Sequence, residues 1–213
     1  MALKFTMLTW IIIAASAAAS LPKPVEAKGS PASWVRATDL PEIDENAAVT
    51  TFDLTVDASG HPAGCSIIVR SGSEQLDAAV CKSLMQRASF KPSKGSDGSN
   101  TASIYRERVV WLPNAGGSNY WFKGADIVVA TTKLPKVLKQ VAEVLVITDG
   151  HDGPSTCLIS KSVGIASLDE MACSVATDPK ISPPITIQGV QVSGVRLLRV
   201  GFEPGSIARV TIR

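Results

Sequence analysis

The sequence predicts an α+β protein of two tandem small domains, each a three-stranded antiparallel sheet covered by one helix. Two observations support this fold class. The four cysteines of the 213-residue chain form two pairs, each with a separation of 16 residues. The pairs are Cys65 with Cys81 and Cys157 with Cys173. Around each pair, the residue patterns follow the order strand, strand, helix, strand, so each pair marks one domain.

An offset of 92 residues relates the two cysteine pairs and several residues around them. The other related positions are Leu76–Asp77 and Leu168–Asp169, Asp57 and Asp149, Pro62 and Pro154, and Pro92 and Pro184. Self-similarity at a fixed offset indicates duplication of one structural unit. We therefore predict a first domain at 31–113 and a divergent second copy at 120–213, with a short linker at 113–119 between them.

The strands of the first domain are predicted from alternation and turn residues. Apolar and polar residues alternate from Val49 to Val56, which indicates a half-buried strand. Turn residues follow at Asp57–Gly60, and Cys65–Val69 begins a second strand, so the two form a hairpin. The polar run Ser93–Asn100 predicts an exposed, mobile loop. Alternation resumes from Ser103 to Trp111, which predicts the third strand.

A helix is predicted between the second and third strands. Ser73 is a suitable amino-terminal cap, and the helix should run to Arg87, before Phe90–Pro92 ends regular structure. The residues of its apolar stripe are Leu76, Val80, Cys81, Leu84 and Ala88. This stripe turns Cys81 toward the sheet, where Cys65 begins the second strand. A bridge between these two cysteines would attach the helix to the hairpin.

The second domain repeats this order with weaker signals. Its predicted elements are a strand with Val144, Val146 and Thr148, a turn at Asp149–Gly153, a strand at Cys157–Ile159, a helix at Leu168–Thr177 preceded by Ser167, and a strand near Val190–Phe202. A last alternating run, Ile207–Ile212, has no counterpart in the first domain.

The amino terminus has the organisation of a secretory signal peptide. Lys4 supplies a positive charge, an apolar run follows at Phe5–Ile13, and small residues follow at Ala14–Ser20. Small residues permit cleavage before Ala18, Ser20 or Lys28. We predict the last of these, which makes residues 1–27 the signal peptide and the protein periplasmic. An uncleaved inner-membrane anchor is the alternative, because the wider apolar run from Phe5 to Leu21 reaches the short limit for a bilayer span.

Export to an oxidising compartment would allow the four cysteines to form disulfides. An even number of cysteines, paired at equal spacing in an oxidising compartment, predicts one disulfide inside each domain. A metal site would need close cysteine pairs or histidines at matching positions, and the chain has neither. We therefore expect the disulfides Cys65–Cys81 and Cys157–Cys173, with no metal site and no cofactor.

The sequence also argues against an enzyme and against a nucleic-acid-binding protein. A net charge of +2 provides no electrostatic surface for nucleic acid. His61 and His151 fall in predicted turns, and Asp77 and Asp169 are the acidic residues that a helix amino end favours. The chain has no nucleophile elbow, phosphate loop or dinucleotide motif. We expect no catalytic residues.

The first domain resembles the TonB carboxy-terminal domain family. The resemblance depends on several sequence motifs. They are Ser71-Gly72-Ser73, Leu76-Asp77, Arg87-Ala88-x-Phe90-x-Pro92, the strand Tyr105–Trp111, and a preceding segment with Trp34 and Pro41. The resemblance covers about residues 31–113 directly. It extends to 121–202 only through the internal repeat.

The resemblance implies a protein partner, either a TonB-dependent outer-membrane receptor or another envelope protein. Domains of this family add an extended segment of the partner as a strand to a sheet edge. The candidate edges are the last strand of each domain, Ser103–Val110 and Val192–Val200. The predicted partner-binding residues are Ser103, Tyr105, Glu107 and Val109. The alternative is that each edge is covered by the other domain.

Two functions follow from the resemblance. Energy transducers of this family have a membrane helix bearing a histidine and a long proline-rich spacer. This chain has no histidine before His61, and only three prolines precede its first domain. We therefore expect a periplasmic binding or adaptor module, with a membrane-anchored energy transducer for receptor-dependent uptake as the alternative.

Overall fold

The structure is a computed structural model, and it describes residues 20–41, 48–112, 118–121, 124–132, 134, 141–151, 153–205 and 209–213. Within these ranges the protein is a mixed α+β molecule, as predicted. The predicted linker at 113–119 and the run Ile207–Ile212 lie partly outside the described residues. Most of the predicted signal peptide also lies outside them.

The first half contains one α-helix and three longer strands. Its elements are β1 (Glu26–Ala27), the 3-10 turns η1 (Pro31–Ser33) and η2 (Ala37–Asp39), β2 (Ala48–Val56), β3 (Pro62–Val69), α1 (Glu74–Arg87), β4 (Phe90–Lys91), β5 (Ser93–Lys94), β6 (Asn100–Leu112) and β7 (Ser118–Trp121). The strand, strand, helix, strand order predicted for this half is present as β2, β3, α1 and β6.

The second half has the same order of longer elements. Its elements are β8 (Ile127–Thr131), β9 (Ala142–Asp149), β10 (Pro154–Lys161), α2 (Ala166–Ala176), β11 (Thr186–Ile187), β12 (Val190–Gln191), β13 (Ser193–Pro204) and β14 (Arg209–Ile212). The strand predicted near Val190–Phe202 is therefore divided between β12 and β13.

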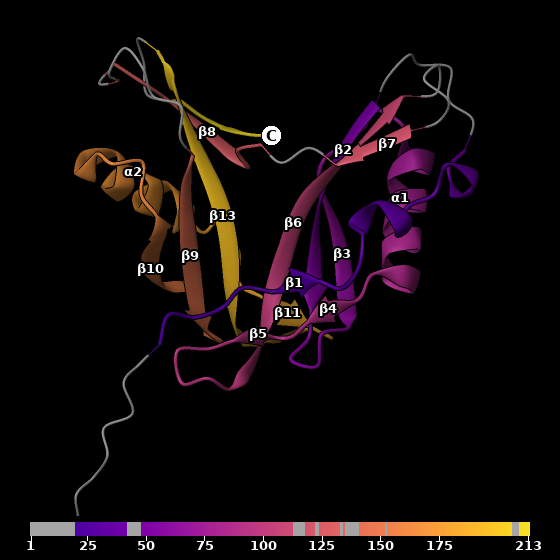
Figure 1. Ribbon diagram of the computed structural model, residues 1–213, viewed down its shortest axis with the longest axis horizontal. Coiled ribbons are helices and arrows are strands. Elements are labelled where there is room, and N and C mark those ends of the chain that lie inside the picture. The colour runs from indigo at the N-terminus through magenta and orange to yellow at the C-terminus, as the bar shows by residue number, and fades with distance from the viewer. Residues whose placement is uncertain are drawn as a thin grey trace, which may run out of the picture.

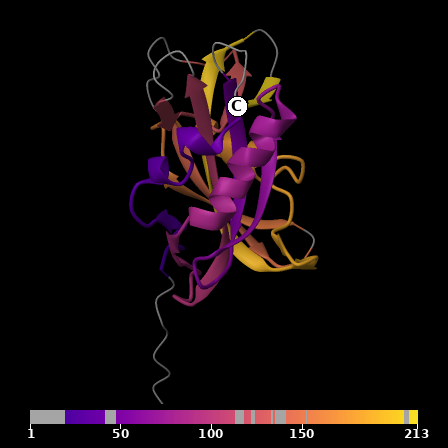
Figure 2. The ribbon, with the colours of Figure 1, turned by 90° about the vertical axis from the view of Figure 1, so that its right-hand side faces the viewer.

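The two halves share one sheet, which differs from the prediction of two separate three-stranded sheets. The longer strands lie in the order β10-β9-β13-β6-β2-β3, and β5, β7, β8 and β14 extend the sheet to ten strands. The halves meet where β13 pairs with β6 in parallel. The other neighbours along this order are antiparallel. The helices lie on opposite outer sides of the sheet, with α1 and α2 at the two flanks of Figure 1 and α1 in front in Figure 2.

Each helix covers the core of its own half. In the first half, Phe52, Leu54 and Val56 are fully buried on the face of β2 that the alternation predicted. They pack with the apolar stripe of α1, whose Leu76, Val80 and Leu84 are buried. In the second half, α2 contributes Leu168, Ala172 and Ala176 to the corresponding core. Burial of these faces is the main force that holds each helix on the sheet.

Residues 20–35, which we call the N-terminal segment, are built into the first half. β1 pairs antiparallel with β4, and Lys23 and Lys94 exchange two backbone hydrogen bonds of 2.9 and 2.8 Å. Val25 and Trp34 are 8% and 3% exposed within the first core. The predicted cleavage before Lys28 would remove β1, because Glu26 and Ala27 precede that site. Figure 1 shows the segment crossing the sheet near the meeting of β6 and β13.

Three local features differ from the sequence prediction. Regular structure does not end at Phe90, because Phe90–Lys91 forms β4 against β1. The predicted loop begins with a strand, since Ser93 and Lys94 pair with the start of β6, and Ser93 is 1% exposed. Ser167 lies inside the first turn of α2 instead of preceding it, because the cap position is Ile165.

Candidate functional site

The meeting of β6 and β13 is a short joint, defined by residues 102–104 and 194–196. Three consecutive residue pairs are in parallel register there. The hydroxyl of Ser103 donates to the Val195 carbonyl at 2.5 Å, and that of Thr101 donates to the Ser193 carbonyl at 3.1 Å. A Cβ atom at Gly194 would lie 2.6 Å from the Ala102 carbonyl oxygen. Only glycine therefore allows the two strands to approach so closely.

Beyond the joint, β6 and β13 diverge, as Figure 1 shows. Charged side chains connect the two strands there. We call Glu107, Asp126 and Arg199 the charge cluster. Arg199 donates to Asp126 at 2.9 Å and to Glu107 at 3.1 Å, and Asp126 is 2% exposed. Asp126 also accepts the backbone N–H of Arg199 at 2.8 Å. These charge-assisted bonds fasten the segment before β8 to both halves of the sheet.

Burial governs the protonation of the charge cluster. Burial raises the pKa of Glu107, and the nearby Arg199 guanidinium opposes this only in part. For Arg199 itself, burial would lower the pKa, but the hydrogen-bonded carboxylate of Asp126 outweighs it and raises the pKa. Arg199 is therefore a permanent cation, and the ionised form of Glu107 is disfavoured by its surroundings.

A second ion pair lies on the opposite face of β6. Arg106 donates to both carboxylate oxygens of Asp53 on β2, at 2.6 and 2.7 Å, and the two side chains are 2% and 8% exposed. Next along the same face, Arg108 donates to the Ala125 carbonyl at 2.6 Å. Sequence reasoning missed both ion-pair groups. Their signal was the run Arg106–Arg108, because charged residues in the middle of an alternating strand require partners when that strand is central.

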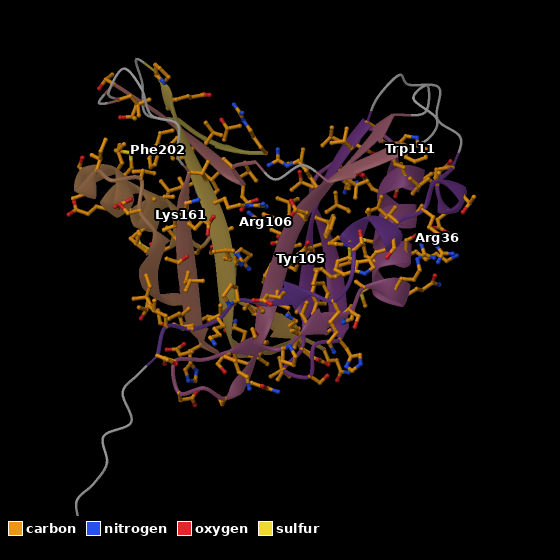
Figure 3. All side chains as sticks on the ribbon, viewed as in Figure 1. Arg36, Tyr105, Arg106, Trp111, Lys161 and Phe202 are labelled. Carbon is orange, nitrogen blue, oxygen red and sulfur yellow. A yellow bond between two sulfur atoms is a disulfide. The ribbon has the colours of Figure 1, made fainter. Side chains whose placement is uncertain are left out.

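Tyr105 and Glu107 line a groove between β6 and the N-terminal segment. The groove has a volume of about 450 Å³, and its other walls are Val25, Glu26, Ala27, Gly29, Ser30, Pro31 and Ala32. The Tyr105 ring packs with Phe90 and Trp34, at centroid distances of 5.0 and 5.9 Å. Figure 3 labels Tyr105 and the neighbouring Arg106 along β6. A smaller hollow of about 100 Å³ is also lined by Tyr105 and Glu107, and it extends to Leu197 and Arg199.

The structure places the four predicted edge residues in different surroundings. Ser103 is buried in the joint with β13. Val109 is 2% exposed in the first core, and its strand position pairs with Trp121 of β7. Only Tyr105 and Glu107 reach the groove. The second candidate edge, Val192–Val200, is flanked on one side by β9 and on the other by β6 and β8.

Both predicted disulfides are present. Cys65 is joined to Cys81, and Cys157 to Cys173, each with a Cα–Cα distance of 5.7 Å. Each bridge attaches a helix to the neighbouring outer strand, β3 or β10. For the first half, the apolar stripe of the helix predicted this attachment, because it turns Cys81 toward the sheet. Their position beneath the helices gives them a structural role.

The recurring aspartates hold the connections between strand and helix. Asp77 is 4% exposed and accepts the backbone N–H of Ser71 at 3.1 Å and the hydroxyl of Thr50 at 2.9 Å. Asp169 accepts the backbone N–H of Val163 at 3.0 Å. These hydrogen bonds explain why the Leu-Asp pair recurs in both halves more fully than the preference of a helix amino end for acidic residues does.

The two histidines lie in hairpin turns, as predicted. The ring of His61 is 2.7 Å from the Ser59 hydroxyl, and the backbone N–H of His61 donates to Asp57. His151 donates its backbone N–H to Asp149 at 3.0 Å. Within the described ranges, no three His, Cys, Asp or Glu side chains are grouped so as to hold a metal ion. No helix among the same residues is long and apolar enough to cross a membrane.

Comparison with known proteins identifies the family of the first half. Searches of curated proteins and of solved structures found no significant match. Residues 45–111 match the family described as Gram-negative bacterial TonB protein C-terminal. The match spans β2, β3, α1 and most of β6, and therefore includes the Cys65–Cys81 bridge, Asp77 and the groove residues of β6. Residues 45–111 of this chain belong to the TonB carboxy-terminal domain family.

Proposed function

We propose that this chain is an exported protein of the cell envelope that binds another protein in the groove along β6. Domains of the TonB carboxy-terminal family interact with proteins, among them outer-membrane receptors, and residues 45–111 form such a domain. Two disulfides agree with an oxidising compartment such as the periplasm. The groove lined by Tyr105 and Glu107 is the observation that supports this binding site most directly.

The groove adjoins a short gap in the sheet. On the side of β6 that faces β13, the described residues leave a gap at 105–108, between the pairing with β13 and the pairing with β7. Arg199 reaches this gap, where its Nη2 donates a hydrogen bond of 3.5 Å to the Arg106 carbonyl oxygen. A stretch of strand edge that no other strand covers can take up an extended peptide. A partner segment of only a few residues would fit, because the strand is paired at both ends of the gap.

The proposed site is tested by filling the groove. Ala32 is an exposed residue of η1 on the groove wall, and Ala32→Trp would occupy part of its volume. Ala37→Trp is the matched control, since Ala37 is exposed on η2 and does not line the groove. The probe is a synthetic peptide copied from the extended amino-terminal segment of a TonB-dependent receptor. We expect Ala32→Trp to weaken binding at least tenfold in fluorescence anisotropy. Equal affinities of the two variants would refute the site.

The second half is proposed to be a divergent copy of the first. β10 begins 92 residues after β3, and the disulfide and the contact from an aspartate to the strand-to-helix connection both recur at that offset. Its role in this proposal is structural, because β13 occupies the edge of β6 at the joint. The protein would then act as a binding or adaptor module with one groove.

A membrane-anchored energy transducer is the alternative function. The family relationship favours it, and the two proposals differ in where the protein is found. Osmotic shock should release an adaptor into the periplasmic fraction. A transducer should remain with the inner membrane, and loss of the chain should then abolish receptor-dependent uptake.

A further inference from the structure

A small pocket in the second half lies beside a buried arginine. Its walls are Val146, Thr148, Pro154, Ser182, Pro183, Ile185 and Arg196. Its volume is about 10 Å³, which suits a single particle close to the size of a water molecule. The pocket belongs neither to the groove nor to the charge cluster.

Arg196 is a buried cation without a carboxylate partner among the described residues. It is 3% exposed, and its guanidinium donates to the carbonyl oxygens of Ile181 and Pro183 at 3.3 and 3.2 Å. No ion pair of the described chain includes it. Asp53 is the acidic residue that acts on it electrostatically, but Arg106 already binds both oxygens of Asp53.

The charge of Arg196 persists at neutral pH. Burial lowers the pKa of Arg196 to about 10, which still leaves the guanidinium protonated. A buried charge is costly unless an opposite charge or a set of hydrogen bonds compensates it. The two carbonyl bonds compensate Arg196 only in part, so a counter-ion would lower the remaining cost.

The other polar groups of the pocket are hydroxyls that have protons to donate. Ser182 is 2% exposed, and its hydroxyl has no hydrogen-bond partner in the described structure. The Thr148 oxygen accepts the backbone N–H of Gly150 at 3.4 Å, which leaves its own proton available. No carboxylate lines the pocket, and its remaining walls are apolar. Donors combined with apolar walls suit an anion and exclude a metal cation.

The corresponding place in the first half is filled by aromatic rings. Tyr105 pairs with Leu54 on β2, and Arg196 pairs with Val146 on β9, which is 92 residues after Leu54. At the same offset, Ser182 stands where the first half has Phe90, whose ring packs against Tyr105 at 5.0 Å. A serine and an arginine thus replace two rings that pack at a tilt, and the pocket lies beside them.

We propose that this pocket binds one monovalent anion of the size of chloride, held by Arg196, Ser182 and Thr148. The volume excludes phosphate and carboxylate ligands, which have several heavy atoms. The anion would neutralise the charge of Arg196, which takes part in no ion pair among the described residues. It would therefore stabilise the second half of the protein.

The first test measures thermal unfolding of the full chain at constant ionic strength, with sodium chloride replacing sodium gluconate. Because a ligand stabilises the state that binds it, we expect chloride to raise the Tm by roughly 2–4 °C. Ser182→Val would fill the pocket and should remove this dependence. Ser155→Val on the exposed face of β10 is the control and should retain it. A Tm that ignores chloride, or a Ser182→Val variant that keeps the full response, would overturn the proposal.

The second test needs no variant. Crystals of the wild-type protein grown in sodium bromide should show an anomalous scattering peak within hydrogen-bonding distance of the Arg196 guanidinium. Density for a water molecule in place of bromide would show that the pocket holds solvent only, which refutes an anion site.

Discussion

Asp77 shows at the residue scale how one buried carboxylate stabilises a connection. Its Oδ1 atom receives hydrogen bonds from the start of the strand-to-helix connection and from Thr50 on β2. The side chain therefore links the helix, the connection and the sheet. Asp169 makes a similar contact to Val163, but it is half-buried and its other partner is the exposed Ser162 hydroxyl.

We predict that Asp77→Ala lowers the free energy of unfolding by about 1–3 kcal/mol, because it leaves the half-buried Ser71 N–H and the buried Thr50 hydroxyl without their acceptor. Asp169→Ala should cost less, since Asp169 is half-buried and the Ser162 hydroxyl, one of its two partners, is exposed to water. Gln75→Ala, at an exposed position of the same helix turn, is the control and should change stability by about 0.5 kcal/mol or less. Urea unfolding measures all three. An Asp77→Ala cost equal to that of the control would contradict the structural role.

Glu107 predicts a pH dependence of stability. Its pKa is raised in the folded protein, so above its ordinary value of 4.5 the folded state binds more protons than the unfolded state. The contribution of this group is then fully present below pH 4.5 and is lost as pH rises through the folded pKa. Glu107→Gln removes the titration and leaves Asp126 to pair with Arg199.

We expect the difference in unfolding free energy between Glu107→Gln and wild type to shift in favour of the variant as pH increases above 4.5. Chemical denaturation at a series of pH values measures this difference. Comparison at each pH cancels the effects of the other acidic groups. A difference that does not change with pH would show that Glu107 has an ordinary pKa.

At the scale of elements, the N-terminal segment is a structural part of the first half. It supplies Val25 and Trp34 to the core, the strand β1 that pairs with β4 in a small two-stranded sheet, and one wall of the groove. Small residues also permit signal-peptide cleavage before Ser20, and that site leaves β1 intact. We therefore propose cleavage before Ser20 in place of the site before Lys28 that the sequence predicted.

We predict that the exported protein begins at Ser20, which intact-mass measurement of the periplasmic fraction would establish. A chain that begins at Lys28 should unfold more readily than one that begins at Ser20. Loss of the buried Val25 side chain alone costs about 1.5–3 kcal/mol. The two chains should therefore differ in Tm by several degrees. A mature protein that begins at Lys28, with the same Tm as the longer chain, would contradict the assignment.

At the scale of the whole molecule, the joint and the charge cluster make one cooperative unit of the two halves. β6 and β13 pair at the joint, and Arg199 connects Glu107 of the first half with Asp126 at the start of the second. Contacts of this kind between two halves couple their unfolding. We therefore expect one thermal transition in calorimetry instead of two.

Gly194→Ala tests that coupling, because its Cβ would lie 2.6 Å from the backbone oxygen of Ala102. The strands would have to separate, and the Tm should fall by several degrees, with a loss of about 1–3 kcal/mol. Gly64→Ala on β3 is the control, since its Cβ would find its nearest neighbours at 3.7 Å. Two separate transitions in the wild-type protein, or equal Tm values for the two variants, would refute the coupling.

The sequence by itself determined the local elements and the covalent links of this protein. Alternation located β2 and β6, the apolar stripe and Ser73 located α1, and equal cysteine spacing identified both disulfides. These features depend on periodicity and on neighbours within about one element, so a single sequence displays them. The family motif at Ser71–Asp77 is also a local feature, because the Asp77 side chain accepts the backbone N–H of Ser71 within the same strand-to-helix connection.

Only the tertiary structure decided how the halves combine. The joint of β6 with β13, the charge cluster, and the groove under the N-terminal segment each bring together residues that are far apart in sequence. The charged run Arg106–Arg108 indicated that these side chains need partners. It could not predict that the partners are Asp53 and Arg199, because no periodic pattern shows which distant strand lies alongside. Strand pairing therefore covers part of the predicted partner-binding edge, Ser103–Val110. Of the four predicted binding residues, Tyr105 and Glu107 line the groove.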